Sequence, residues 1–288
     1  MWNQDDALEF SVMEDMLVFR SLDEDKEGNV SAVYSVPNVN GHYKNLIQNL
    51  IDETKELKQQ FVLTYLNEER KQMLEELFPG KFQFEEHRSR AEYIYDVEAL
   101  ARLSGRKYHK KKNHVNKFYK TYDFVYENLD ATNIEECRAM SDLWEEQRVE
   151  RFELTEEEKK LGKKDRAVRR ILREEKSFQK ELRAVEIGLD HFEELGLSGG
   201  LIRVNGEVKA FTYGEPITKD TFGTHVEKAS NEIPELYAVM NHQFALNHLG
   251  DYKYVNREED LGFEGLRKAK LSYHPAILLD CYTATLCE

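Results

Sequence analysis

The sequence has few cysteines, few prolines and no long apolar run. Cys137, Cys281 and Cys287 are its three cysteines, and none of them forms a CxxC pair. This odd, sparse set argues against a disulfide framework and against a structural zinc site. No segment approaches the 18 apolar residues of a membrane-spanning helix, and the acidic start, MWNQDDALEF, lacks signal-peptide features. We therefore expect a cytoplasmic protein.

Several chemical signatures are also missing. The nine histidines show no metal-binding spacing with carboxylates, so we expect no metal. The sequence has no GxSxG motif, no phosphate loop, no dinucleotide fingerprint and no kinase motif set. Nucleophilic hydrolysis, hydrolysis of nucleoside triphosphates and hydride transfer are therefore unsupported.

The charge of the chain is unevenly distributed. The formal net charge is −14, yet residues 101–120 hold eight Lys or Arg and no carboxylate. Because the remainder is strongly acidic, broad coating by nucleic acid is excluded, and any contact with a polyanion must be local. The segment "LSGRKYHKKKNHVNKF" is the obvious place for such a contact.

This basic segment has the spacing of an amphipathic helix. Val115, Phe118, Tyr119 and Tyr122 follow an i, i+3, i+4, i+7 pattern, which predicts a helix over residues 107–122 with its lysines outward. The alternative is a solvated helix face with no ligand. The candidate phosphate-binding or polyanion-binding residues are Arg106, Lys107, Lys110, Lys111, Lys112 and Lys117.

The rest of the chain alternates between strand and helix patterns, which predicts an α/β (α+β) fold with mixed sheets flanked by helices. Asn205-Gly206 is a strong hairpin signal between two strands. "AILLDCYTATL" reads as one final strand. We expect two domains, residues 1–125 ending in the basic linker helix and residues 126–288 carrying the substrate site.

The order of elements in residues 126–288 resembles the GNAT acyltransferase fold, and residues 1–125 show a weaker version of it. The segments "LSGRKYHKKKNHVNKF" and "YVNREEDLGFEGLRKAKLSYHP" resemble a bacterial family similar to the C-terminal catalytic domain of phosphatidylglycerol lysyltransferase. The resemblance is clearest over residues 91–284. It implies tandem GNAT-like domains related to Fem-type transferases, which move an amino acid from aminoacyl-tRNA to an amine or hydroxyl.

The segment that would bind coenzyme A lacks the residues for that task. GNAT enzymes bind the pyrophosphate on a glycine-rich loop that opens a helix. Here the equivalent segment is "HVEKASNEIPE", which has no glycine and carries Glu227, Glu232 and Glu235. We therefore expect no tightly bound cofactor, and aminoacyl-tRNA is favoured over acetyl-CoA as the donor.

A polar cluster, "NREEDLG", follows a predicted strand, where ligand crevices form in α/β folds. A carboxylate there could remove the proton of an attacking amine, and Arg257 could hold a substrate carboxylate. Arg257 could instead pair with Glu258 or Asp260, and Asp260 could cap the next helix. The candidate catalytic residues are Glu227 and Glu258. The candidate substrate-binding residues are Tyr237, Asn241, Asn256, Arg257, Asp260 and Lys270.

The favoured hypothesis is an acyl or aminoacyl transferase that uses a donor of the aminoacyl-tRNA type. Its partners would be tRNA and a small-molecule or peptide amine. One alternative is a CoA-dependent N-acetyltransferase with an atypical donor site. Another is a non-catalytic module that binds a polyanion.

Overall fold

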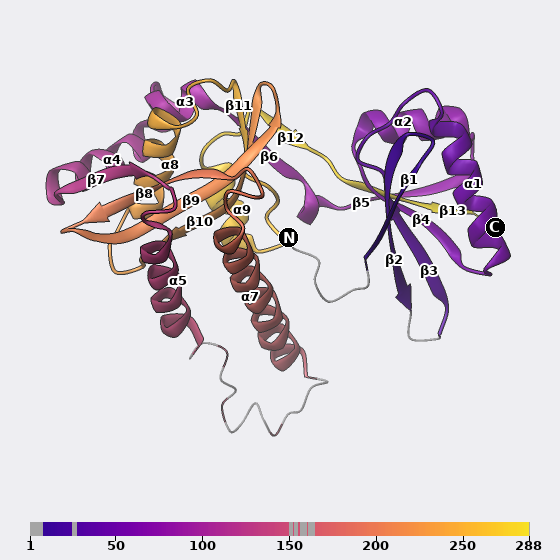
Figure 1. Cartoon of the computed structure of the whole chain (residues 1–288), viewed down its shortest axis with the longest axis horizontal. Helices are drawn as coiled ribbons and strands as arrows, with labels where there is room; N and C mark the ends of the chain where they lie inside the picture. Colours follow the sequence, from indigo (N-terminus) through magenta and orange to yellow (C-terminus); the bar gives the residue numbers. More distant parts are fainter. Residues whose placement is uncertain are drawn as a thin grey trace. The chain divides into compact units, whose positions relative to one another are not determined.

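The computed structural model describes residues 8–24, 28–149, 152, 155, 160 and 165–287, and it divides into two compact units (Figure 1). The larger unit is built mainly from residues 93–258 and 269–277. The smaller unit is built from residues up to 92, residues 259–268 and residues from 278. Part of the charged segment at residues 156–180 lies outside the described residues.

The smaller unit contains a six-stranded mixed sheet in the order β1-β2-β3-β4-β13-β5. β3 and β4 are parallel, and the other neighbours are antiparallel. The α1 face with Leu46, Ile47, Leu50 and Ile51 is buried in the core. Its elements are β1 (Glu9–Met13), β2 (Met16–Glu24), β3 (Val30–Ser35), α1 (Tyr43–Glu56), β4 (Gln60–Leu66), α2 (Glu68–Leu77), β5 (Phe82–Glu86), η1 (Arg88–Arg90) and β13 (Tyr282–Leu286).

The larger unit contains a seven-stranded mixed sheet in the order β12-β6-β11-β10-β9-β8-β7, in which β10 and β11 are parallel. Its strands are β6 (Glu92–Asp96), β7 (Phe124–Asn128), β8 (Ser198–Val204), β9 (Glu207–Thr218), β10 (Thr221–Ala229), β11 (Tyr254–Asn256) and β12 (Ile277–Leu279). Its helices are α3 (Val97–Arg102), η2 (Arg106–Tyr108), α4 (His109–Thr121), α5 (Ile134–Val149), α7 (Arg166–Asp190) and α8 (Leu236–Asn247), and α9 (Glu264–Leu271) is shared between the units.

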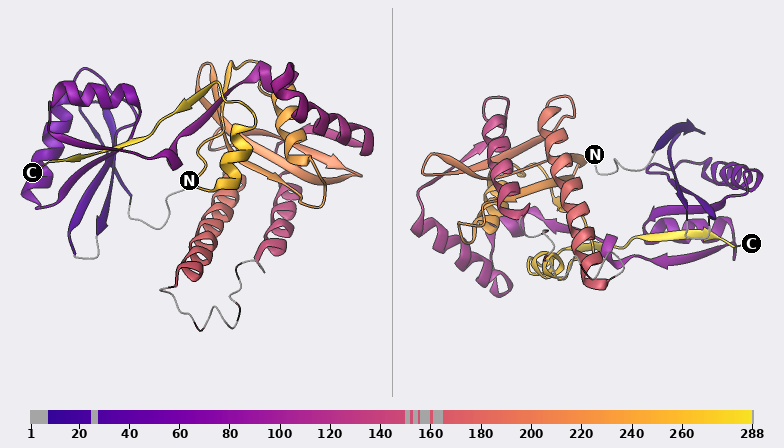
Figure 2. Two further views of the ribbon diagram at one scale, coloured as in Figure 1. Left: turned by 180° about the vertical axis from the view of Figure 1, so that it is seen from behind. Right: turned by 90° about the horizontal axis from the view of Figure 1, so that it is seen from below.

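The helices of the larger unit cover both faces of its sheet. α5 and α7 lie side by side against one face, where Cys137 and Met140 join the core around Tyr213 (Figure 2). α8 covers the opposite face, with the rings of Phe222 and Phe244 5.7 Å apart. α3 and α4 pack against α8. The face covered by α8 is the one that carries the candidate site.

Several predictions are confirmed. The fold is mixed α/β with two mixed sheets flanked by helices. The basic segment forms η2 and α4, and Val115 and Phe118 are buried as the spacing requires. Asn205 and Gly206 have φ of 54° and 84° in the tight turn between β8 and β9, a conformation that Asn and Gly adopt readily.

The domain boundary and the final strand differ from expectation. The boundary expected after residue 125 falls inside the larger unit, because β7 pairs with β8 and extends that sheet. The segment read as one strand is β12 and β13, which belong to different sheets. β6 follows β5 in the sequence but joins the seven-stranded sheet, and β13 follows β12 but joins the six-stranded sheet. Each sheet is completed by a strand that lies far from its neighbours in the chain.

Candidate active site

The site begins at an irregularity in β10. Thr224 pairs with Gly214 and Val226 pairs with Tyr213, so His225 is an extra residue in β10 with no partner of its own on β9. Such a β-bulge bends a strand and redirects side chains, and bulges are frequent beside active sites. Glu227 follows on the face that α8 covers. The bulge therefore places two titratable side chains close together along a central strand.

Glu227 is the centre of a buried ion pair. Arg257, which directly follows β11, donates to Glu227 Oε2 from Nη2 at 2.5 Å and from Nε at 3.1 Å. The amide of Asn241 on α8, with its oxygen facing Arg257, accepts from Nη1 at 3.1 Å. The Arg257 side chain is 10% exposed. Three candidates from distant segments therefore meet, but through a pairing that the sequence did not indicate.

Aromatic rings enclose the guanidinium of Arg257. Its Cζ lies 5.1 Å from the centre of the Tyr273 ring and 5.5 Å from that of Tyr95, within the range of cation–π attraction. Burial acts to lower the pKa of Arg257, but the charge and hydrogen bond of Glu227, together with Tyr95 and Tyr273, outweigh burial and raise that pKa. Burial raises the pKa of Tyr273 to about 12. Arg257 is thus a fixed cation between neutral rings.

Glu258 follows in a left-handed backbone conformation, with φ of 57°. Its N–H donates to Asn256 Oδ1 at 2.9 Å, and its carbonyl accepts from Tyr93 N at 3.2 Å. The ammonium of Lys270 donates to the carbonyls of Arg257 and Glu258. Non-glycine residues at positive φ persist where the surroundings fix them, often at functional sites. Asn256 and Lys270 therefore hold the backbone that presents Glu258.

Glu258 and Glu215 bind the two ring nitrogens of His225. His225 Nδ1 lies 2.7 Å from Glu258 Oε1, and Nε2 lies 3.2 Å from Glu215 Oε1. Burial acts to lower the pKa of His225, but the two carboxylates, first Glu258 and then Glu215, together outweigh burial and raise it. A protonated imidazole donates to both carboxylates at once. The bulge thus holds a Glu–His–Glu array.

This array predicts that stability depends on pH. The pKa of His225 is raised in the folded protein, so its contribution is complete below the unfolded value of about 6.5 and is lost as pH rises through the folded value. We expect the free energy of unfolding to fall from pH 6.5 upward, and His225→Gln to remove about 1–3 kcal/mol at pH 6 and flatten this fall. Urea unfolding at a series of pH values measures both effects.

The exposed His191, which lies 2.8 Å from Glu194, provides the matched control. His191→Gln should leave the pH dependence close to that of the unmodified protein, because exposed pairs contribute little. Equal pH slopes in the His225→Gln variant and the unmodified protein would contradict the assignment.

Two other candidates differ from this cluster in exposure or in the unit to which they belong. Tyr237 is 41% exposed, although it is one turn from the buried Asn241 on α8. Asp260 belongs to the smaller unit, where it is fully buried and accepts from Arg267 Nε at 2.7 Å and from Gly262 N at 2.9 Å. The expected pairing of Arg257 with Glu258 or Asp260 does not occur, because Glu227 binds the guanidinium.

An ion pair between Glu235 and His114 lies where the connection from β10 enters α8. Glu235 directly precedes α8, and its carboxylate contacts His114 of α4. Glu235 has φ of 70° and makes no side-chain cap of the helix. This is the place where a GNAT enzyme would need open backbone N–H groups and glycines. Here a carboxylate and an imidazole fill it.

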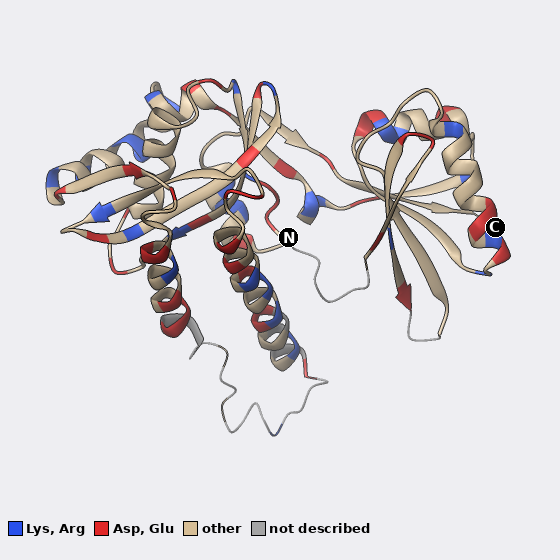
Figure 3. Cartoon of the chain, in the orientation of Figure 1, with Lys and Arg blue, Asp and Glu red and all other residues tan. Residues whose placement is uncertain are grey.

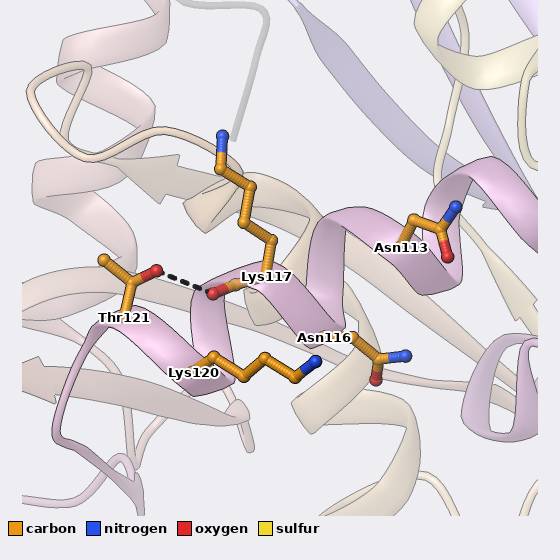
Figure 4. A pocket seen from close by; sticks show the side chains of 5 residues that line it. All are labelled: Asn113, Asn116, Lys117, Lys120 and Thr121. Carbon is orange, nitrogen blue, oxygen red and sulfur yellow. Dashed lines mark hydrogen bonds between the residues drawn. The ribbon is translucent and has the colours of Figure 1, made fainter.

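The basic residues of η2 and α4 mostly face solvent. Figure 3 colours the Lys positions along α4 blue, and no acidic residue lies on the helix. A shallow pocket on this helix is lined by Asn113, Asn116, Lys117, Lys120 and Thr121, and Figure 4 shows the side chain of Lys120 directed toward Asn116. The exposed candidates are Arg106, Lys107, Lys110, Lys112 and Lys117.

Sequence reasoning missed two features. Glu215 lies in β9 and gave no signal, because its link to His225 depends on a bulge that only strand pairing reveals. Lys111 was grouped with its neighbours, but it turns inward. The helical spacing could have shown this, since Lys111 lies four residues before Val115 on the buried side of α4.

Within the described ranges, no helix is long and apolar enough to cross a membrane. Nor do any three His, Cys, Asp or Glu side chains in that part of the chain come together as a metal site would require.

The geometry can now be compared with known proteins. The chain matches the family model "Phosphatidylglycerol lysyltransferase, C-terminal" over residues 1–285, and it belongs to that family. Family and fold point to an acyl or aminoacyl transferase. The comparison with curated proteins gave no match.

Three solved structures share the fold over nearly the whole chain. A conserved protein of unknown function from Bacteroides thetaiotaomicron is 36% identical, with a TM-score of 0.82 over 97% of this chain and 86% of that one. L-PGS from Bacillus licheniformis is 13% identical, with a TM-score of 0.61 over 96% and 83%. The C-terminal domain of a protein described as a lysylphosphatidylglycerol synthetase from Agrobacterium fabrum is 13% identical, with a TM-score of 0.63 over 99% and 85%.

Proposed function

We propose that this protein transfers an aminoacyl group from an aminoacyl-tRNA to an amine or hydroxyl acceptor. The observation that carries the proposal is the start of α8, where Glu235 and His114 occupy the position at which a CoA pyrophosphate would bind. A carboxylate there repels pyrophosphate, and the connection has no glycine that would let backbone N–H groups approach it. This disfavours acetyl-CoA as the donor.

A nucleic-acid donor needs a local cationic surface, and α4 supplies one. Lys110 and Lys112 are exposed on α4, Lys107 is exposed on η2 just before it, and neither helix carries a carboxylate. Lysine and arginine side chains bind phosphate oxygens without reading base identity. A surface of this kind suits a tRNA donor, because it binds the phosphate backbone that all tRNAs share, whichever amino acid they carry.

Glu227 and Glu258 have different roles in the proposed reaction. Glu227 is held by Arg257, whose guanidinium also donates to Asn241, so we assign Glu227 to positioning. Glu258 is part-exposed and shares a hydrogen bond with His225, so we assign to this pair the removal of the proton from the attacking amine or hydroxyl. The acceptor nitrogen or oxygen then bonds to the carbonyl carbon, the ester bond to the ribose breaks, and the ribose oxygen takes up a proton.

The proposal is tested with tRNA charged separately with each amino acid, in the presence of amine acceptors. We expect faster loss of at least one aminoacyl ester, with formation of the acceptor adduct. Glu258→Gln should slow it about 10²-fold or more, which is the usual range for acid–base catalysis. No loss above background for any amino acid would overturn the donor assignment.

Two controls separate the alternatives. Acetyl-CoA should not raise the melting temperature, because a ligand that binds only the folded state must stabilise it. Charge reversal at Lys107, Lys110 and Lys112 should weaken tRNA binding and lower its salt dependence, whereas reversal at the exposed Lys44, Lys55 and Lys58 should not. Salt-sensitive binding without any transfer would favour the non-catalytic module instead.

A further inference from the structure

Lys111 differs from the other lysines of α4 in its surroundings. Lys110 and Lys112 on either side are exposed, whereas Lys111 is half-buried and its Nζ lies 3.9 Å from the centre of the Tyr273 ring. The opening of α4 thus sends two cations to solvent and one toward the site.

The surroundings of Lys111 hold more positive than negative charge. The Tyr273 ring that it contacts is also contacted by Arg257. Of the two carboxylates that act on the Tyr273 ring, Glu227 is bound by Arg257 and Glu235 is bound by His114. In the part of the chain that the structure describes, no carboxylate forms an ion pair with Lys111. Its N–H groups are left for a ligand.

Charge and burial both destabilise the ammonium in the free protein. Burial, then Arg257, then Lys110 lower the pKa of Lys111 to about 8, and Glu235 opposes them weakly. A bound anion would reverse this effect, because an opposite charge within about 4–6 Å favours the charged form. The position therefore gains more from an anion than an exposed lysine does.

We propose that Lys111 binds one phosphate group of the donor at a subsite against Tyr273. The exposed lysines of α4 bind phosphates further along the same nucleic-acid strand. The inference rests on the proposed function, since it takes the donor to be a nucleic acid. Lys111 is continuous in sequence with the exposed cations and adjoins the Arg257–Glu227 pair. A nucleic-acid strand that lies along α4 would therefore enter the site at Lys111. A lysine acts as a point charge that suits a phosphate, whereas a carboxylate is better matched by an arginine fork.

The test uses uncharged RNA, so it does not depend on turnover. Binding of the ribotrinucleotide CCA is measured by titration calorimetry at low salt for Lys111→Gln, Lys111→Arg and the matched control Lys110→Gln. We expect Lys111→Gln to weaken binding about tenfold or more, because a hydrogen bond to a charged group is lost in a half-buried place. Lys110→Gln should weaken it only about two- to threefold, because exposed charges are screened.

The pH dependence gives a readout that a merely structural role would not change. Below pH 8 Lys111 is already protonated, whereas above it each further pH unit should weaken CCA binding by up to tenfold until the pKa of the bound state is reached. Lys111→Arg should abolish this loss, because arginine stays charged.

Two outcomes overturn the inference, and a third bears on the proposed function alone. If Lys111→Gln binds CCA as the unmodified protein does and Lys110→Gln does not, the outer face of α4 acts alone. If CCA does not bind, but vesicles of phosphatidylglycerol bind in a manner that needs Lys111, the phosphate belongs to a lipid. Failure of transfer with intact, Lys111-dependent CCA binding would count against the proposed function and leave the subsite standing.

Discussion

Arg257→Met will lower the free energy of unfolding by about 3–5 kcal/mol and abolish transfer. The substitution leaves the Glu227 carboxylate without the guanidinium that contacts it at 2.5 Å, in a place where water cannot replace it fully. It also removes the cation between Tyr95 and Tyr273. Urea unfolding monitored by circular dichroism gives the first quantity, and the aminoacyl-transfer assay gives the second.

The paired substitution separates charge from packing. Glu227→Gln together with Arg257→Met should be more stable than Arg257→Met alone, because no uncompensated charge remains. Arg257→Lys should fall between the unmodified protein and Arg257→Met, since lysine keeps the charge but loses the fork. A loss below about 1 kcal/mol for Arg257→Met would show that the pair is solvated rather than buried.

Division of the chain after residue 125 will yield two fragments that do not fold separately. Residues 1–125 lack β13, which pairs with β4 on one side and β5 on the other. Residues 126–288 lack β6, which pairs with β11, and also lack α3 and α4. Each fragment therefore leaves strands without hydrogen-bonding partners inside a sheet, not at its edge.

Nuclear magnetic resonance spectra measure this result directly. Each fragment alone should give poorly dispersed amide signals, and the two expressed together should recover the spectrum of the intact chain. A chain shortened to residues 1–280 keeps β12 and tests β13 alone, and we expect its smaller unit to lose cooperative unfolding. A well-dispersed spectrum from residues 1–125 alone would contradict the strand order.

Local patterns in the sequence predicted local structure well. The spacing of Val115 and Phe118 defined α4, and Asn205-Gly206 defined a hairpin, because both signals depend on neighbours a few residues apart. The strand pairing could not be obtained in this way. β13 pairs with strands about 200 residues earlier, and nothing in "YTATL" distinguishes an inner strand of one sheet from an extension of β12.

The sequence predicted residues of the candidate site better than it predicted the contacts between them. Glu227, Asn241 and Arg257 were named from their positions on strands and a helix, and they do meet. Which carboxylate binds Arg257 depends on the bulge at His225 and on the left-handed turn at Glu258, and both are set by tertiary structure. Asp260 looked equivalent to Glu258 in the sequence, but the backbone between them passes into the other unit.

The position of β13 also limits when a newly made chain can fold. β4 has one of its two neighbours, β3, close by in the sequence, but its other neighbour is not synthesised until about residue 286. Until then, β4 and β5 expose unpaired backbone groups beside an apolar core, the state in which nascent chains aggregate. The larger unit, whose last internal strand is β11, can close first while residues beyond 277 are still being added. Folding of the smaller unit is therefore the step at which ribosome-associated chaperones would matter most.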